Sequence, residues 1–588
     1  MTAPIRLPRA WLIALVGAAL ALAGCVAVPT SGPVERISGQ QPACQNCVNV
    51  EVAPPEAGDD PGQIVEGYLR ATSNFQPGYS VAKQFLSKSA QEKWSPEVGV
   101  SVFRPTAQVA TGNSTVQLTG RLVGSLAKDR TFTARDQDLK VNFPLVNENG
   151  EWRIDDPPPG LMVAEYSFRT FYKAYDLYFI GNGVSLVPDP IFLPSLRSPQ
   201  NVASALITSL LSGPSAWLKP AVTTAVPTGT TLSVSSVTIT DGIADVPLSE
   251  EMLTLTDARR SLVAAQIVYT LKQSGIGIKG VVIRVNQQTL RVPGADPNSQ
   301  VISVDAIPRE MEPVSFVAGE QLYGMRGGRM QLITSNADTP NPKPIEGPLG
   351  DGDYSVDSMA VSLANTDLAV VTNGRTVLRH APTTTGAVDT LMDDATDLLR
   401  PQFTRYGELW VIGRQAGRQR IWVFDGARRH SVDAPLLDGG RIIAFKVSPD
   451  GARIALIRKT ATGSELGMAR ISRADKIMVD GWRALNTTQS MSPRITRMVD
   501  VAWIDPNDVL VLGAPDKDAA IAPFRVTEDA SQISTAGESD NWDALELTVL
   551  LRTQTAIIRG GRGGRTWKYD GSSWVAYLDK ITALAYPG

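Results

Sequence analysis

From Pro313 onward the sequence repeats a loose unit, in which an inner apolar strand is followed by a polar turn and a second apolar strand. The units recur roughly every 40 to 56 residues, and their clearest copies are 359–371, 401–412, 444–457 and 500–512. A period of this length in an all-β segment is typical of a β-propeller. A β-sandwich or a stack of sheets would not explain so regular an inner strand.

The same segment predicts how the propeller closes. Five complete strand groups extend from Met359 to Leu578, and a sixth can be assembled only from residues 313–348 and one further strand. The remaining candidate for that strand is Ile581–Tyr586, which has the pattern of an inner strand. Because a closed ring leaves no sheet edge unpaired, we expect six blades, with this strand joining the first blade.

The amino terminus predicts where the chain is located. Arg6 and Arg9 precede an apolar run from Trp11 to Ala23, which is too short to span a bilayer and is typical of a signal peptide. The run ends in Leu-Ala-Gly before Cys25, which resembles the lipobox of bacterial lipoproteins. The resemblance implies a diacylglycerol on the Cys25 thiol, cleavage just before it, and attachment to the outer face of the cytoplasmic membrane. The alternative, an uncleaved anchor, would need a longer apolar run and a cluster of stop-transfer charges.

Composition and hydropathy bear on two questions, whether the chain binds nucleic acid and whether it crosses a membrane. The 588 residues include 56 lysines and arginines against 59 acidic residues, a net charge of -3. This balance gives no reason to expect a nucleic-acid partner. No second stretch is apolar enough to predict a further membrane span, so we expect the lipid to be the membrane attachment.

Two further cysteines, Cys44 and Cys47, form the motif Cys-Gln-Asn-Cys. Outside the cytoplasm such a pair can oxidise, and we favour a small local disulfide. A thioredoxin-like motif would follow an apolar strand and begin a helix, but this pair lies among proline, glutamine and asparagine. A zinc site would need two more ligands, and the only histidines, His380 and His430, belong to the predicted propeller. We therefore predict no metal and no cofactor.

The chain divides into five segments by pattern. Residues 1–24 form the signal peptide, 25–59 a tether rich in proline and glycine, 60–160 a first domain, 165–305 a second domain, and 310–588 the propeller.

The first domain is predicted to be a small α+β unit. Asp60 and Pro61 begin a helix whose apolar face is Ile64, Tyr68 and Ala71, and Phe85 and Leu86 suggest a second short helix. Strands with alternating apolar residues then follow at 116–118, 141–145 and 150–154. This order resembles the cone-shaped folds of the nuclear-transport-factor-like kind.

The second domain also combines helices and strands. We expect strands at 177–180, 234–239, 243–249 and 281–285. We also expect one helix that begins at Pro199 and a second helix from Arg260 to Lys272. This order, with the stretch Thr224–Thr230 and the Asp241-Gly242 turn, resembles the GerM-type domain of sporulation and germination lipoproteins. Pro247 stands where that resemblance would suggest an acidic residue before Leu248 and Ser249. The family is not known for catalysis.

Two glycine-rich hairpins carry arginines: Arg326-Gly-Gly-Arg329 and the run from Arg559 to Arg565. Neither is a phosphate loop, because a Walker loop ends in Gly-Lys-Ser/Thr before a helix, whereas these glycines lie between strands. A solvated hairpin tip is the simplest interpretation, and an anionic envelope polymer or an acidic partner is the alternative.

The sequence contains few patterns typical of catalytic sites. No His-Glu-x-x-His or Gly-x-Ser-x-Gly pattern occurs. Ser80 to Lys83 and Ser125 to Lys128 match Ser-x-x-Lys, but neither copy is accompanied by a Lys-Thr-Gly motif. The two histidines fall in neighbouring expected blades, and no serine is placed to complete a triad. We predict that the chain is not an enzyme.

Together, the lipobox, tether, small α+β domain, GerM-type domain and C-terminal propeller resemble the LpqB family of actinobacterial lipoproteins. The resemblance implies an accessory to the MtrA and MtrB two-component system, which binds the extracytoplasmic domain of the MtrB-like sensor kinase and modulates cell-wall and division signalling. An envelope-polymer binding module is the first alternative. A cell-wall hydrolase is the second.

Overall fold

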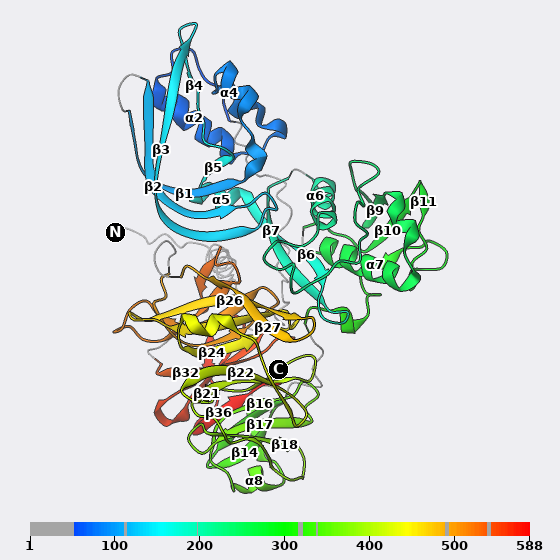
Figure 1. Ribbon diagram of the computed structural model, residues 1–588, viewed down its shortest axis with the longest axis vertical. Coiled ribbons are helices and arrows are strands. Elements are labelled where there is room, and N and C mark those ends of the chain that lie inside the picture. The colour runs from blue at the N-terminus through cyan, green and yellow to red at the C-terminus, as the bar shows by residue number, and fades with distance from the viewer. Residues whose placement is uncertain are drawn as a thin grey trace, which may run out of the picture. The chain divides into compact units, whose positions relative to one another are not determined.

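The computed structural model describes residues 52–110, 114–196, 198–273, 275–314, 321–336, 339–487, 493–537 and 542–588 (Figure 1). The predictions for Cys25, Cys44 and Cys47 fall outside these residues. None of the helices in the described part of the chain is long and apolar enough to cross a membrane.

The first domain begins with the predicted helix. Helix α2 covers Pro61–Ser73, and Asp60 is its N-cap: its carboxylate accepts from the Gln63 amide at 2.9 Å, while the Gln63 side chain accepts from the Asp60 amide at 2.8 Å. This reciprocal capping box satisfies two amides that the helix cannot bond internally. The expected second helix ends earlier than predicted, because α3 covers Ser80–Gln84 and Phe85 is its C-cap. Phe85 and Leu86 are buried in the core, so their apolar character reflects burial and not a helical face.

A five-stranded sheet completes this domain, in the order β4-β3-β2-β1-β5. Its strands are β1 Val100–Ala110, β2 Thr115–Leu126, β3 Phe132–Glu148, β4 Glu151–Ile154 and β5 Leu161–Ala164, with helices α4 Lys88–Lys93 and α5 Glu165–Phe171 beside them. Strands β1 and β5 run parallel and the other pairs antiparallel. Val116 lies opposite Phe143 in the register, and the Phe143 ring meets Tyr68 of α2 edge-on at 6.2 Å. The helix therefore packs on the sheet through the alternating apolar face that the sequence showed.

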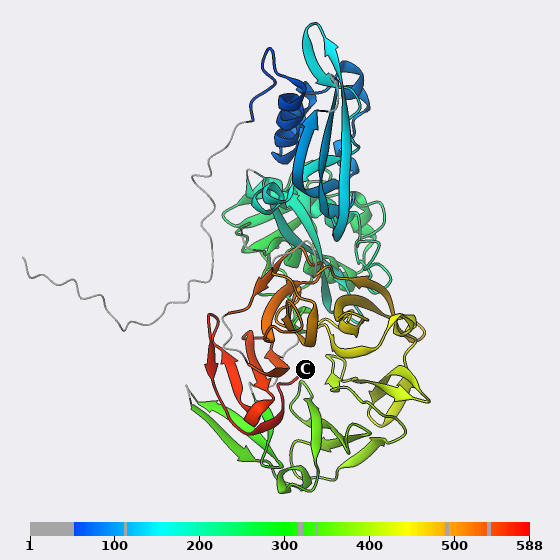
Figure 2. The same ribbon diagram turned by 90° about the vertical axis from the view of Figure 1, so that its left-hand side faces the viewer.

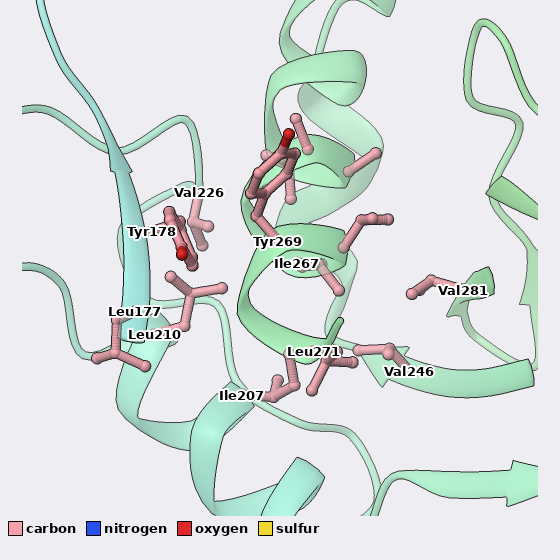
Figure 3. Packing of buried hydrophobic residues seen from close by; sticks show 14 of the residues in the cluster. Leu177, Tyr178, Ile207, Leu210, Val226, Val246, Ile267, Tyr269, Leu271 and Val281 are labelled. Carbon is pink, nitrogen blue, oxygen red and sulfur yellow. The ribbon is translucent and has the colours of Figure 1, made fainter. Parts of the chain in front are cut away.

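The second domain contains a long hairpin, two helices and a small sheet. The hairpin is β6 Tyr172–Ile180 with β7 Leu186–Pro194, the helices are α6 Pro199–Leu211 and α7 Asp257–Leu271, and the sheet strands are β8 Thr238–Thr240, β9 Ile243–Leu248, β10 Gly280–Val285, β11 Gln288–Thr289 and β12 Ile302–Ser303. Figure 3 shows Tyr178 of the hairpin on the side of β6 that faces α7, and its ring meets that of Tyr269 edge-on at 5.3 Å.

One strand of this domain differs from the prediction. The sequence suggested a strand over 234–239, whereas β8 begins only at Thr238. Val234 is 59% exposed, Ser235 and Ser236 are also exposed, and only Val237 is buried, so the run before β8 lacks the alternating buried positions that would hold it in the sheet.

The propeller is built from six four-stranded sheets arranged around a centre (Figure 2). Blade one contains β13 Leu322–Arg326, β14 Arg329–Asn336, β15 Thr339–Pro344 and β36 Ile581–Ala585, and blade two contains β16 Val356–Val361, β17 Asp367–Thr372, β18 Val377–Pro382 and β19 Asp389–Met392. Blade three contains β20 Gln402–Phe403, β21 Leu409–Gln415, β22 Arg418–Asp425 and β23 Arg428–Ser431, and blade four contains β24 Ile442–Val447, β25 Arg453–Lys459, β26 Ser464–Arg473 and β27 Ile477–Ala484. Blade five contains β28 Arg497–Trp503, β29 Asp508–Ala514, β30 Ala522–Thr527 and β31 Ile533–Thr535, and blade six contains β32 Ala544–Leu550, β33 Thr555–Gly560, β34 Thr566–Tyr569 and β35 Trp574–Ala576.

Closure of the ring follows the prediction. Strand β36 pairs antiparallel with β13, with Tyr323 opposite Ala585 and Gly324 opposite Leu584. Blade one is therefore made from two segments at opposite ends of the propeller sequence. The prediction of six blades closed by the last strand is confirmed.

Candidate functional site

A cavity of about 230 Å³ opens among the starts of the inner strands of the propeller. Five of the six blades contribute to its wall, and we call it the channel mouth. Its lining residues are Asp357, Ser358, Arg375, Leu398, Leu399, Arg400, Ile443, Ala444, Phe445, Val499, Asp500, Leu545, Glu546 and Arg559. Such a concave site with a few converging polar groups is a standard candidate for ligand binding.

Arg400 lines the channel mouth and makes polar contacts there through both of its terminal nitrogens. One terminal nitrogen, Nη2, donates to both carboxylate oxygens of Asp500 at 3.0 and 2.9 Å. The other, Nη1, donates to the Leu547 carbonyl at 2.8 Å and contacts Glu546 at 3.4 Å. Burial alone would lower the pKa of Arg400, but the charges of Asp500 and Glu546 hold that pKa above its ordinary value. The guanidinium therefore links blades five and six as a permanently charged group.

Asp500 has no capacity left for a ligand. Besides Arg400, its two oxygens accept from the backbone amides of Val501 at 2.9 Å and Leu547 at 2.7 Å. A carboxylate offers about four acceptor positions, and these contacts fill them. The Arg400–Asp500 pair is thus part of the propeller framework.

Lys446, on β24, lies near this pair and lines a second cavity of about 30 Å³. Its ammonium donates to the backbone carbonyl of Gly588, and its own carbonyl accepts from the Trp503 indole at 3.0 Å. Burial, reinforced by the positive charge of Arg400, lowers the pKa of Lys446 to about 7. The interior of the ring thus holds a lysine whose charge changes near neutral pH.

Arg559 and Arg375 differ from Arg400 because, within the described part of the chain, at least one of their terminal guanidinium nitrogens has no partner. Arg559 donates through Nε to Glu546 at 2.7 Å, and among the described residues its two terminal nitrogens have none. Arg375 donates through Nε to the Leu398 carbonyl at 2.9 Å and through Nη2 to the Asp397 carbonyl at 3.4 Å, which leaves Nη1. The channel mouth therefore contains hydrogen-bond donors that the fold does not use.

Among the charged residues described in the channel mouth, the sequence singled out only Arg559 as a candidate for binding. Arg559 belongs to the glycine-rich hairpin that the sequence drew attention to, and the structure places it in the cavity wall. Arg562 and Arg565 of the same run lie at the turn between β33 and β34, where Gly563 and Gly564 have φ of 67° and 58°. In the other hairpin, Gly327 and Gly328 at φ of 59° and 78° form the turn between β13 and β14. Arg400, Asp500 and Glu546 gave no signal, because they meet only when three blades are assembled.

A second feature lies on the surface of the first domain. Tyr166 on α5 is 80% exposed, which is unusual for so large an aromatic side chain. The residue before it, Glu165, is fixed between two arginines, Arg104 at 2.7 Å and Arg169 at 2.8 Å. We call Tyr166 with Arg104, Glu165 and Arg169 the α5 patch.

The candidate catalytic groups do not assemble into an active site. The Ser80 hydroxyl contacts Gln76 at 3.5 Å and the Ser125 hydroxyl accepts from Arg135 at 3.4 Å, and neither contacts the lysine of its motif. His380 in blade two contacts Asp367 at 2.9 Å, and Ser362 also contacts Asp367, at 3.5 Å. In a triad the serine must contact the histidine, so this order of groups cannot activate the hydroxyl.

The described residues also form no cluster of side chains of the kind that binds a metal ion. Within the residues that the structure describes, no three histidine, cysteine or acidic side chains come together in a group that could hold a metal ion. The prediction of no metal and no cofactor stays a prediction.

Three family models match this chain. Residues 54–169 match "Lipoprotein LpqB, N-terminal domain", residues 176–291 match "Sporulation and spore germination", and residues 331–583 match "Lipoprotein LpqB beta-propeller domain". The folds described above and these matches define a multidomain bacterial lipoprotein with a GerM-type domain and a six-bladed propeller.

The curated relatives make the assignment more specific. Lipoprotein LpqB of Cutibacterium acnes is 26% identical over 97% of this chain and 98% of its own length, and lipoprotein LpqB of Streptomyces avermitilis is 25% identical over 97% of each. The chain belongs to the LpqB family of lipoproteins. Among solved structures, TolB from Acinetobacter baumannii is 12% identical, with a TM-score of 0.34 over 57% of this chain and 86% of that one.

Proposed function

We propose that this lipoprotein is anchored through Cys25 on the outer face of the cytoplasmic membrane, where it binds the extracytoplasmic domain of an MtrB-like sensor kinase and modulates cell-wall and division signalling. Membership of a lipoprotein family supports the anchor. A lipid attached to a tether that covers residues 25–59 keeps the first domain within reach of other proteins on the same membrane.

The observation that carries the proposal is the exposure of Tyr166 in that first domain. Aromatic and arginine side chains dominate the energetics of protein interfaces, and the α5 patch places both kinds together. Because Glu165 bonds both arginines, they need little further ordering when a partner binds. We therefore take the α5 patch as the surface that contacts the kinase.

Photo-crosslinking in membranes tests this assignment. A photoreactive amino acid replaces Tyr166 in the full chain, and the crosslinked partner is identified by mass spectrometry. The matched control carries the same amino acid at Val575 on β35, which is 54% exposed in the propeller. The kinase should be captured from position 166 and not from position 575. Equal capture from both positions, or from neither, contradicts the role of the α5 patch.

A functional measurement separates binding from modulation. Tyr166→Ala removes the exposed ring and should leave the melting temperature unchanged, since surface substitutions of this kind alter stability little. Kinase autophosphorylation in membranes containing the variant should then match that in membranes lacking the lipoprotein. Autophosphorylation equal to that with the wild-type chain would count against the proposal.

A further inference from the structure

The channel mouth has the hydrogen-bonding pattern of an anion site. We propose that it binds one oxyanion group, a carboxylate or a phosphate, held between the terminal nitrogens of Arg559 and Arg375. This site goes beyond the proposed contact with a kinase, which uses the first domain.

The balance of donors and acceptors at the channel mouth favours an anion. A guanidinium carries five N–H donors in a planar fork, and Arg559 uses only one of its nitrogens while Arg375 uses two. On the acidic side, Asp500 is fully engaged and both oxygens of Glu546 already accept from arginines. The unused groups are therefore mainly donors, and guanidinium forks match carboxylate and phosphate oxygens in geometry.

Asp357 is the one acidic group at the rim that is exposed to solvent. One of its oxygens accepts from the backbone amide of Arg375 at 2.8 Å. This contact fixes the loop that carries Arg375. Because Asp357 is exposed, the high dielectric constant of water weakens its repulsion of an anion deeper in the cavity.

Ser358 gives an independent indication of a missing partner. Its hydroxyl oxygen is buried in the cavity wall and has no hydrogen-bond partner among the described residues. A buried hydroxyl without a partner is costly, and its cost disappears when a ligand supplies the bond. Turning the Ser358 side chain to another staggered rotamer brings the hydroxyl to the cavity, where an oxyanion can accept its hydrogen.

The size and walls of the cavity limit the occupant. A volume of about 230 Å³ is smaller than the roughly 300 to 1,000 Å³ of pockets for drug-sized molecules. Leu398, Leu399 and Phe445 line the same space, so water is partly excluded around the charged groups. The ligand is therefore a small anion or the anionic end of a larger molecule.

A thermal-shift titration of the purified full chain in detergent tests the site. Sodium phosphate and sodium acetate are added separately, and sodium chloride keeps the ionic strength constant so that general screening does not change. At least one of the two anions should raise the melting temperature along a saturating curve, because a ligand that binds only the folded state stabilises it. Response to phosphate alone identifies a phosphate site, and response to acetate alone a carboxylate site. No saturable response to either anion overturns the proposal.

Matched arginine variants locate the response. Arg559→Gln should raise the half-saturating anion concentration at least tenfold. Arg565→Gln is the control, because Arg565 lies in the same hairpin, outside the cavity, with its side chain 73% exposed. If both variants respond as the wild-type chain does, the anion binds elsewhere and the proposal is wrong.

Ser358→Ala keeps the test decisive if Arg559→Gln fails to fold. The variant removes a hydroxyl that has no partner in the free protein, so its melting temperature without anion should equal or exceed that of the wild type. Its half-saturating anion concentration should rise about threefold or more. An unchanged concentration contradicts the assignment of Ser358. Since no kinase is present, failure of this experiment leaves the proposed function untouched.

Discussion

Leu584 in β36 lies opposite Gly324 in β13, so the innermost strand of the first blade comes from the opposite end of the propeller sequence. Ile581, Ala583 and Leu584 are almost completely buried, which means that closure also removes apolar surface from water. The hydrogen bonds of β36 and its side chains act together to hold the ring.

Deletion of residues 581–588 should therefore destabilise the whole propeller by several kcal/mol, because it opens the ring and uncovers β13. The change should appear as a drop of many degrees in the melting temperature of the propeller. Thr582→Ala is the control, since the Thr582 side chain on the same strand is exposed. A truncated chain that melts within about a degree of the intact one would contradict a closing role for β36.

Arg453 should be the most sensitive charged residue in the propeller. Its side chain is completely buried, where it pairs with both Asp450 and Glu528 and also donates to the Pro506 carbonyl at 2.8 Å. Arg453→Ala leaves the buried Asp450 carboxylate without its cation and the buried Glu528 carboxyl without its hydrogen-bond donor, which costs about 3–5 kcal/mol. Urea unfolding should show this loss, whereas Arg565→Ala at the surface should cost about 0.5 kcal/mol or less.

Glu528 should make the stability of the propeller depend on pH. Burial, only partly offset by Arg453, raises the pKa of Glu528 to about 8. Between the unfolded pKa near 4.5 and about 8, the folded chain holds a proton that the unfolded chain has released, so stability should fall as pH rises through this window.

Glu528→Gln tests that assignment, because glutamine resembles the protonated carboxyl at every pH. The variant should match the wild type near pH 5 and exceed it near pH 8, by on the order of a few kcal/mol at most. Melting curves at the two pH values give the comparison. Parallel pH profiles for the two proteins would show that another group controls the dependence.

Features encoded by neighbouring residues could be predicted from the sequence. Asp60 and Pro61 specify the start of α2 through contacts within four residues, and the inner-strand pattern of Ile581–Tyr586 indicated closure because alternation and repeat length are local properties. The channel mouth could not be predicted in the same way. Arg400 meets Asp500 and Glu546 from segments far apart in the sequence. Arg400 lies just before β20, Asp500 in β28 and Glu546 in β32, and none of them stands out among its neighbours in the sequence.

Val234 shows a different limit. The run from Val234 to Val237 has the composition of a strand, yet Val234 is exposed, Val237 alone is buried, and β8 begins later. The apolar pattern failed there because strand formation depends on what covers the residues, and that information lies elsewhere in the chain. The exposure of Tyr166 could not be predicted for the same reason. In the sequence, an aromatic residue that stays exposed cannot be distinguished from one that another part of the chain covers.

Cys44 and Cys47 remain predicted to be oxidised to each other and to be dispensable for folding. Closing so short a loop removes little entropy from the unfolded chain, and the pair lies in the tether, away from any predicted core. Mass spectrometry of the alkylated native protein should detect the disulfide, and the double serine variant should melt like the wild type. Two free thiols would contradict the pairing, and a large fall in melting temperature would contradict dispensability.

Cys25 remains predicted to carry the lipid, and its substitution tests the anchor without disturbing the domains. The residue follows the apolar run directly and precedes every folded segment that the structure describes, so Cys25→Ser should leave the melting temperature of the domains unchanged. Serine has no thiol to accept the diacylglycerol. Each methylene buried in the bilayer contributes about 0.8 kcal/mol, so loss of the acyl chains removes most of the membrane affinity. Labelling cells with radioactive palmitate should mark the wild-type chain and not the variant. Label incorporated equally into both chains would show that the lipid is attached elsewhere.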